Sequence, residues 1–203
     1  MICVLTGDII NSRGIKPDTW MSVLKNALET IEADTSKWEI YRGDSFQIEL
    51  SDIEESFINA VYIKACIKTQ HDLDVRIAIG IGEKSFEGTT VSESNGQVFQ
   101  FSGETLEKLK QEKTNLKLKT SQPHLDRQLN LMFKLASVAM DNWTQNSAEI
   151  VKLAIERPDA SQEDIGRSID INQTAVSRRQ QRAHLDLVLE LDGYYRQQLQ
   201  QLS

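Results

Sequence analysis

Cysteine, proline and long apolar runs are scarce in this chain. Its 203 residues include only 2 cysteines and 3 prolines. No apolar run approaches the roughly 20 residues that span a bilayer. The first residues lack a basic segment followed by a long apolar one, so we expect a buried strand there and not a signal peptide. We therefore expect a cytoplasmic protein of one large or two small domains, with no membrane partner.

We also expect no disulfide, and the chain has no excess of basic charge. Cys3 and Cys66 lie in apolar stretches, and we expect them to be buried thiols because cytosolic proteins rarely use disulfides. The formal net charge at pH 7 is -7. That charge argues against general coating of nucleic acid, so any contact with nucleic acid requires a local basic patch. The 3 histidines are dispersed and show no metal-ligand spacing.

The first 120 residues combine short β-branched runs with amphipathic stretches. Their order predicts β-α-β-β-α-β-α-β, the split βαβ pattern of a ferredoxin-like α+β fold with one antiparallel sheet and helices on one face. The expected strands are 2–5, 38–41, 46–50, 75–81 and 116–120, and the expected helices are 17–33, 53–70 and 99–111.

Strand signals stop near Pro123, which is the best candidate for a domain boundary. We expect one domain over residues 1–122 and an all-α domain over residues 123–203. A helix at 125–142 should be followed by three more helical segments. The last of these begins at Gln173 and is expected to continue past Ala183, with an apolar stripe wide enough for packing on the first domain or for a homodimer.

The most informative feature of the chain is a pair of Gly-Asp dipeptides, each following an apolar run. The first strand should end at Gly7-Asp8, and the predicted hairpin carries Gly43-Asp44. Carboxylates at the ends of neighbouring strands can share a cation such as Mg²⁺, which prefers oxygen ligands. The alternative is that Gly-Asp merely shapes a turn, since the dipeptide is common there.

A loop at residues 9–15 should lead from the first strand to a helix, and its backbone amides could receive a triphosphate. The residues expected to bind a nucleotide are Asn11, Ser12, Arg13, Arg42 and Gly43. The two arginines could equally be solvated loop residues, because exposed arginines need no explanation.

Three segments resemble the class III nucleotidyl cyclases: Val4-Leu5-Thr6-Gly7-Asp8-Ile9-Ile10-Asn11-Ser12, Arg42-Gly43-Asp44-Ser45-Phe46, and Arg76-Ile77-Ala78-Ile79-Gly80-Ile81-Gly82. Over its whole length the chain is similar to the SatD family of small bacterial proteins. The resemblance implies a palm, or cyclase-type, domain. It also implies that Asp8 and Asp44 bind Mg²⁺ or Mn²⁺, with the Ile9 carbonyl as a lesser ligand.

The resemblance has departures. The cyclases place an asparagine and an arginine on the helix after the glycine-containing strand, and the corresponding region here offers Asn95 but no helical arginine. The diguanylate cyclase signature needs a second glycine and an acidic residue, where this chain has Arg42 and Ser45. The resemblance therefore implies a site for metal or nucleotide, and leaves catalytic residues unassigned.

The segment 161–178 has the spacing of a helix-turn-helix. Ser161 and Asp164 resemble a capping box, and Asn172 can cap the second helix. Gly166 is small where the two helices should cross. Asp170 stands where such motifs usually have glycine, and aspartate tolerates left-handed geometry.

The second helix would present polar residues near its start, where base edges are reached, and a local basic patch for phosphates. The residues expected to contact DNA are Gln173, Thr174, Ser177, Arg178, Arg179 and Arg182. The alternative is an ordinary helical pair with a charged outer face. Residues 145–203 hold seven Lys and Arg against nine Asp and Glu, so binding by a monomer should be weak.

Two functions follow. The first is a DNA-binding regulator whose palm domain senses a nucleotide, such as a nucleoside triphosphate, with a divalent metal. The second is an enzyme, a Mg²⁺- or Mn²⁺-dependent nucleotidyl cyclase or nucleotidyltransferase with a helical assembly domain. A palm that only scaffolds is a third reading.

Overall fold

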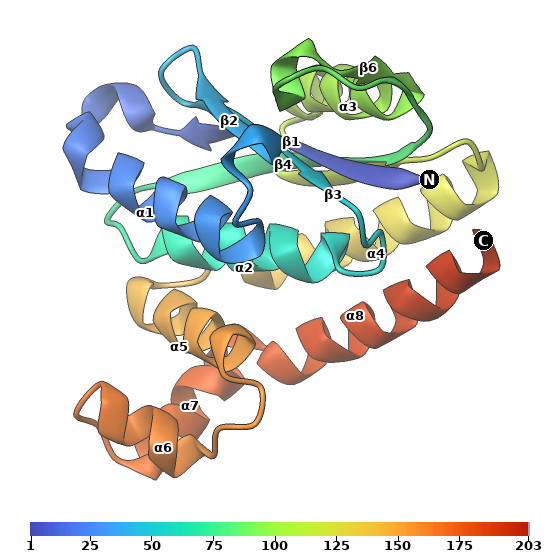
Figure 1. The fold of residues 1–203 in the computed structure, drawn as a ribbon. Helices are drawn as coiled ribbons and strands as arrows, with labels where there is room; N and C mark the ends of the chain where they lie inside the picture. The colour runs from blue at the N-terminus through green and yellow to red at the C-terminus, as the bar shows by residue number, and fades with distance from the viewer. Residues whose placement is uncertain (203) are drawn as a thin grey trace.

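The computed structural model describes residues 1–202 and shows an α+β fold with eight α-helices in that range (Figure 1). A mixed five-stranded sheet has the order β2-β3-β1-β4-β7. Among residues 1–202, none of the helices combines the length and the apolar character needed to cross a membrane.

The sheet and its helices come from the first part of the chain, in nearly the order expected. Its strands are β1 (Ile2–Ile10), β2 (Trp38–Tyr41), β3 (Ser45–Leu50), β4 (Asp74–Gly82) and β7 (Leu116–Lys119), and its helices are α1 (Pro17–Ile31), α2 (Ser56–Lys68) and α3 (Gln97–Glu112). A second sheet that the sequence did not predict pairs β5 (Lys84–Phe86) with β6 (Asn95–Gly96).

Strand β1 is longer than predicted, so Asp8 lies inside it and not at its end. Asp8 pairs with Ser45 of β3 on one side and with Arg76 of β4 on the other. The buried Ile9 continues the alternation of the strand and contributes to the core. The predicted phosphate loop is correspondingly shorter, because β1 continues through Ile10.

The expectations of an all-antiparallel sheet and of helices on one face were wrong. β7 pairs parallel with β4, which is possible because α3 returns the chain as a crossover connection. α3 covers the opposite face of the sheet from α1 and α2 (Figure 1). Small residues on β4 allow this approach: a Cβ on Gly80 would lie 2.5 Å from the Val98 carbonyl oxygen.

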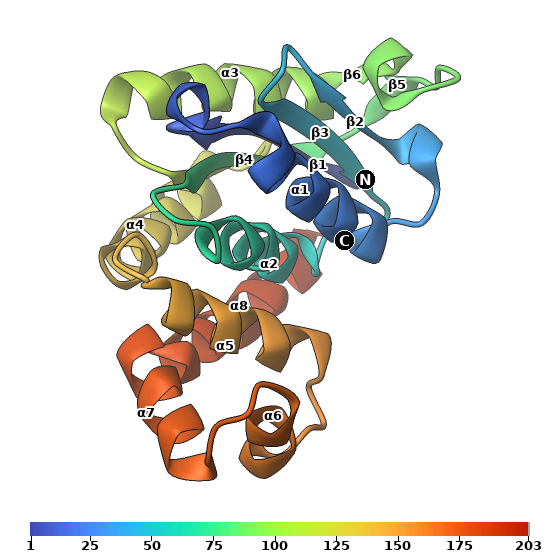
Figure 2. The same ribbon diagram turned by 90° about the vertical axis from the view of Figure 1, so that its left-hand side faces the viewer.

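Helix α2 is buried on nearly all sides and is not the one-sided amphipathic helix predicted. It lies between the sheet and the C-terminal helices (Figures 1 and 2). Even Lys64 is only 4 % exposed, and its Nζ is 2.6 Å from Asp74 Oδ1. A helix that is apolar all round requires cover on every side, so α2 joins the two parts of the molecule.

The C-terminal part is all-helical, as predicted, but it has more helices than expected. They are α4 (Pro123–Met140), α5 (Gln145–Glu156), α6 (Gln162–Ser168), α7 (Gln173–Ala183) and α8 (Leu185–Leu199). The predicted continuous helix from Gln173 breaks at His184, which has a left-handed φ of 52°. This break separates α8 from α7 and lets α8 return toward the sheet (Figure 1).

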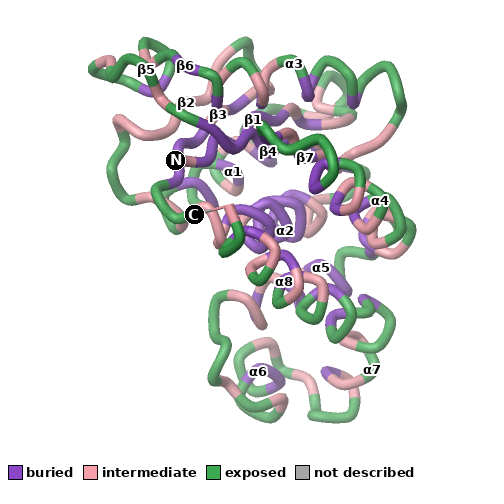
Figure 3. Tube along the Cα trace, turned by 90° about the vertical axis from the view of Figure 1, so that its right-hand side faces the viewer, coloured by how far each residue is buried: buried purple, intermediate pink, exposed green. Residues whose placement is uncertain are grey.

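One hydrophobic core crosses the predicted boundary at Pro123. Phe57 of α2 stacks on Phe133 of α4, with ring centroids 4.9 Å apart, and Tyr195 of α8 lies against both rings. The Tyr195 hydroxyl is 2.6 Å from Ser56 Oγ. Buried residues gather at the sheet and α2, whereas α6 and α7 are largely exposed (Figure 3). Residues 1–122 and 123–202 thus share a core.

Candidate functional site

Asp8 projects from β1 onto the face of the sheet that α3 partly covers. Its Oδ2 is 3.2 Å from Arg76 Nη1 on the neighbouring strand. The Asp8 side chain is only 15 % exposed. Burial raises the pKa of the Asp8 carboxyl above its usual value, and the Arg76 guanidinium opposes that rise. The ion pair thus compensates only part of what the carboxylate loses on leaving water.

Asp44 lies beside Asp8 at the turn of the β2–β3 hairpin. Its Oδ2 accepts a hydrogen bond of 2.6 Å from Ser12 Oγ. Its carbonyl oxygen accepts from the Ile9 amide at 2.9 Å. The negative charge of Asp44 contributes to the raised pKa of Asp8. The structure therefore brings together both predicted carboxylates and Ser12.

Lys110 of α3 adds positive charge near the two carboxylates. It lowers the pKa of Asp8, after the larger effect of Arg76. Tyr41 borders the same region, where burial raises the pKa of its phenol, with a smaller contribution from the charge of Asp8. Strand β1, the hairpin, strand β4 and helix α3 thus each supply a polar side chain to one end of the sheet, which we call the Asp8 region.

Several predicted nucleotide-binding residues have local structural tasks. Asn11 has a left-handed φ of 67°, and its side-chain amide donates to the Asp72 carbonyl oxygen at 3.0 Å. Arg13 and Arg42 are exposed. Arg42 itself occupies a left-handed position of the hairpin turn. The Ile9 side chain is buried in the core, so only its backbone is available to the site.

The glycines of the two Gly-Asp pairs serve the protein's own packing. A Cβ on Gly7 would lie 2.4 Å from the Phe46 ring, so Gly7 makes room for a core side chain. Gly43 has a φ of 88° and open space around it, so the turn requires it for backbone geometry.

The Asp8 region contains two buried polar atoms that find no hydrogen-bond partner within residues 1–202. They are Asp8 Oδ1, an acceptor, and Arg76 Nε, a donor. An atom pair of this kind fits a bound species that presents a cation to the carboxylate and an anionic oxygen to the guanidinium. No group of three or more His, Cys, Asp or Glu residues suited to a metal occurs in the described chain, so a cation here would need oxygen atoms from a ligand or water.

The second candidate region is the pair α6–α7, whose caps match the sequence prediction. Ser161 Oγ accepts from the Asp164 amide at 3.1 Å, and Asp164 Oδ2 accepts from the Ser161 amide at 3.2 Å. Asn172 Oδ1 accepts from the Ala175 amide at 2.8 Å. Asp170 has the left-handed φ expected of it, 54°.

The interior of the α6–α7 pair is small but closed. Ile165 and Val176 are buried, and they pack with Ile150 and Leu153 of α5 in a cluster separate from the main core. A Cβ on Gly166 would lie 2.5 Å from the Ile171 carbonyl oxygen. The predicted close approach at Gly166 is confirmed, and no larger residue fits there without moving the turn.

The outer face of α7 is polar. Gln173, Thr174, Arg178 and Arg182 are exposed. Arg179 differs from the prediction, because its Nη1 is 2.9 Å from Glu149 Oε2 of α5 and its side chain is 20 % exposed. Positive charge on this face thus comes chiefly from two arginines.

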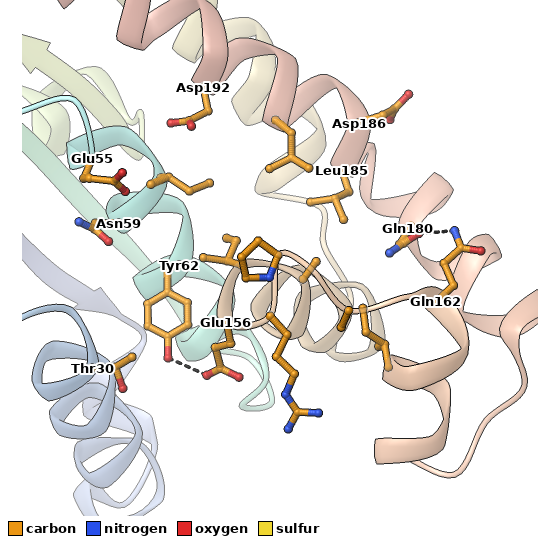
Figure 4. Close-up of a pocket in the computed structure, with 18 of the residues that line it drawn as sticks. Thr30, Glu55, Asn59, Tyr62, Glu156, Gln162, Gln180, Leu185, Asp186 and Asp192 are labelled. Atoms are coloured by element: carbon orange, nitrogen blue, oxygen red, sulfur yellow. Dashed lines mark hydrogen bonds between the residues drawn. The ribbon is translucent and has the colours of Figure 1, made fainter.

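Ser177, also predicted to contact DNA, lines a groove of about 1060 Å³ between the sheet-bearing part and α5 to α8. Figure 4 shows Tyr62 of α2 pointing into this groove, where its hydroxyl donates to Glu156 Oε1 at 2.7 Å. Gln162 and Gln180 join α6 to α7 beside it, with 2.7 Å between side-chain atoms. Ser177 lies at the inner edge of α7.

Sequence reasoning missed Arg76 as the partner of Asp8. The signal was present in β4, where Val75, Ile77 and Ile79 fill one face and Arg76 stands on the other. A buried strand rarely carries an arginine without a partner. The partner, however, depends on strand register, which residues far apart in sequence determine.

Comparison with known proteins adds no relative from which a role could be transferred. No protein-family model matches the chain, and neither the curated proteins nor the solved structures contain a significant match.

Proposed function

We propose that this protein is a DNA-binding regulator in which α6 and α7 form a helix-turn-helix. The observation that carries the proposal is the outer face of α7, where Thr174, Arg178 and Arg182 are exposed beside the capped start of the helix. Side chains near the start of a second helix are those that reach base edges, and neighbouring arginines contact phosphates.

Closed internal packing supports this assignment. The polar caps of α6 and α7 are satisfied within the pair, so the exposed groups on α7 have no structural task there. Since only two exposed arginines lie on this face, the affinity of a single copy should be weak at physiological salt. We therefore propose a cytoplasmic homodimer as the binding form.

Gel-shift titration of Arg178→Ala against a selected operator and against bulk DNA tests the proposal. We expect about 1–3 kcal/mol of lost affinity for the operator and a smaller loss for bulk DNA if Arg178 reads a base. Arg167→Ala, on the exposed side of α6, is the matched control. Equal, unchanged binding by both variants would remove α7 from the interface.

A second candidate function is ligand sensing at Asp8 and Asp44. The buried, unpartnered Asp8 Oδ1 and Arg76 Nε favour it. The two carboxylates would hold Mg²⁺ or Mn²⁺ and Arg76 would bind a phosphate oxygen, with Ser12 keeping Asp44 oriented. A divalent cation there would supply charge neutralisation for a nucleotide triphosphate. Resemblance to the cyclase palm supports the same assignment.

Isothermal titration with each nucleoside triphosphate, with and without Mg²⁺, tests the sensor. Binding should require the cation and should be lost in Asp8→Ala and Asp44→Ala. Glu39→Ala, which removes a half-buried carboxylate of the edge strand β2, should keep it. If none of the four triphosphates binds the wild type, the sensor proposal fails. Pyrophosphate release would instead favour the alternative, a nucleotidyl cyclase or nucleotidyltransferase.

A further inference from the structure

Helix α4 carries an apolar stripe that is uncovered within residues 1–202. Leu131, Leu135 and Val138 are spaced by four and three residues, so they lie along one side of the helix. Their exposed fractions are 61, 66 and 70 %. A single exposed leucine needs no explanation, but three in a row on one helix mark an interaction surface.

Helix α8 extends this stripe. It runs antiparallel to α4 and packs against it (Figure 1), and the Gln128 side-chain amide donates a hydrogen bond to the Tyr194 hydroxyl. Both helices rise about 1.5 Å per residue, so this bond puts Leu135 level with Leu187. Leu187 is itself 56 % exposed. We name the surface made by Leu131, Leu135, Val138 and Leu187 the α4–α8 face.

Charge of opposite sign borders the two sides of the α4–α8 face. Arg127 and Lys134 are exposed on α4, and Asp186 and Glu190 are exposed on α8. In the same register, Lys134 lies midway between the levels of the two acidic residues. Asp186 also lines the groove drawn in Figure 4, at its outer rim. None of these four residues forms an ion pair inside the described chain.

We propose that the α4–α8 face binds the same face of a second copy, about a two-fold axis parallel to the two helices. An isologous contact needs a self-complementary surface. An apolar centre between a basic edge and an acidic edge is such a surface, because the rotation puts α4 against the other copy's α8. Lys134 then faces Glu190 of the partner subunit. This inference rests on the homodimer proposed above and identifies its surface.

Sedimentation analysis over a range of concentrations, without DNA, tests the apolar centre. Leu135→Asp should weaken self-association at least about tenfold, because it replaces a leucine that the dimer buries with a charged side chain. Phe86→Asp is the matched control, since Phe86 is 60 % exposed on β5 and should leave association unchanged. A wild type that stays monomeric, or equal effects of the two variants, would overturn the proposal.

A charge exchange tests the pairing of α4 with α8. Lys134→Glu and Glu190→Lys alone should each weaken self-association about fivefold, because each puts like charges together at both contacts. An equimolar mixture should form heterodimers more tightly than either variant associates with itself, since the pair 134–190 regains opposite charges at both contacts. Mixing without preferential heterodimers would overturn the arrangement. Arg178→Ala should dimerise normally, which separates this inference from the failure of DNA binding.

Discussion

The α6–α7 pair and the Asp8 region of the sheet differ in whether their polar groups have hydrogen-bond partners. In the α6–α7 pair, Ser161 and Asn172 each satisfy a helix terminus, and the polar groups left over face solvent. In the Asp8 region, Asp8 Oδ1 and Arg76 Nε are buried and have no hydrogen-bond partner within residues 1–202. The first region is complete without a ligand, whereas the second gains hydrogen bonds when something binds.

The contrast has an energetic side. Burying a polar atom without a partner costs about 1–3 kcal/mol, and proteins retain such atoms chiefly where function uses them. The fold tolerates this loss in the Asp8 region because the large shared core lies directly beneath it. The small α5–α6–α7 cluster buries far less apolar surface, so its stability depends on caps and on one close glycine contact.

The largest expected effect lies in the α6–α7 pair. Gly166→Ala should destabilise it by roughly 2–3 kcal/mol, because the new Cβ meets the Ile171 carbonyl oxygen. Hydrogen exchange of the α6 and α7 amides would measure the loss locally. The control Gly193→Ala, in open space on α8, should stabilise that helix by about 0.5–1 kcal/mol. A neutral Gly166→Ala would show that this pair is not tightly closed.

The next effect concerns the partly buried ion pair of Asp8 and Arg76. Arg76→Met should destabilise the protein by about 1–3 kcal/mol, since it leaves the Asp8 carboxylate buried without its counter-ion. Urea unfolding measures the change. The double variant Asp8→Asn/Arg76→Met should recover much of that stability. Simple addition of the two single effects would mean that the residues do not interact.

Loss of a cap should have a smaller effect. Asn172→Ala removes the acceptor for the Ala175 amide and should cost about 1 kcal/mol. The same unfolding curves, followed by helical circular dichroism, would record it. Asn172→Asp keeps an acceptor at the cap and should be close to neutral; an Asp variant as unstable as the Ala variant would argue against the cap.

The smallest effect is a pH dependence in the Asp8 region. Burial raises the pKa of the Asp8 carboxyl above its usual value of 3.8. The native state therefore binds its proton more tightly than the unfolded state, and the ionised form opposes folding. Stability contributed by Asp8 should fall as pH rises above 3.8 through the raised pKa. Asp8→Asn should remove this slope, and an unchanged slope would assign it to other groups.

Local features of the chain were predictable from sequence, and non-local ones were not. The capping residues and Asp170 act within a few positions of themselves, so their roles follow from residue type. The pairing of Asp8 with Arg76 depends on strand register, and the place of α3 on the opposite face depends on Gly80 and Ala78 in a distant strand. The break at His184 has no strong sequence signal, because His184 is neither a glycine nor a proline.

The sequence of α2 differs from that of a one-sided amphipathic helix. Its apolar residues occupy every side, including Phe57, Ile58 and Ile63, and such a helix needs partners on all faces. That pattern predicts a central helix. The faces of α2 turned away from the sheet need cover from the C-terminal helices, so the pattern favours one shared core.

The position of Tyr195 has a consequence for how the protein is made. Its ring fills the core beside Phe57 and Phe133, although it lies near the end of the 203-residue sequence. Domains usually fold from the N-terminus while synthesis continues. Here the sheet-bearing part cannot close its core until α8 has left the ribosome, so its folding must wait for the synthesis of α8.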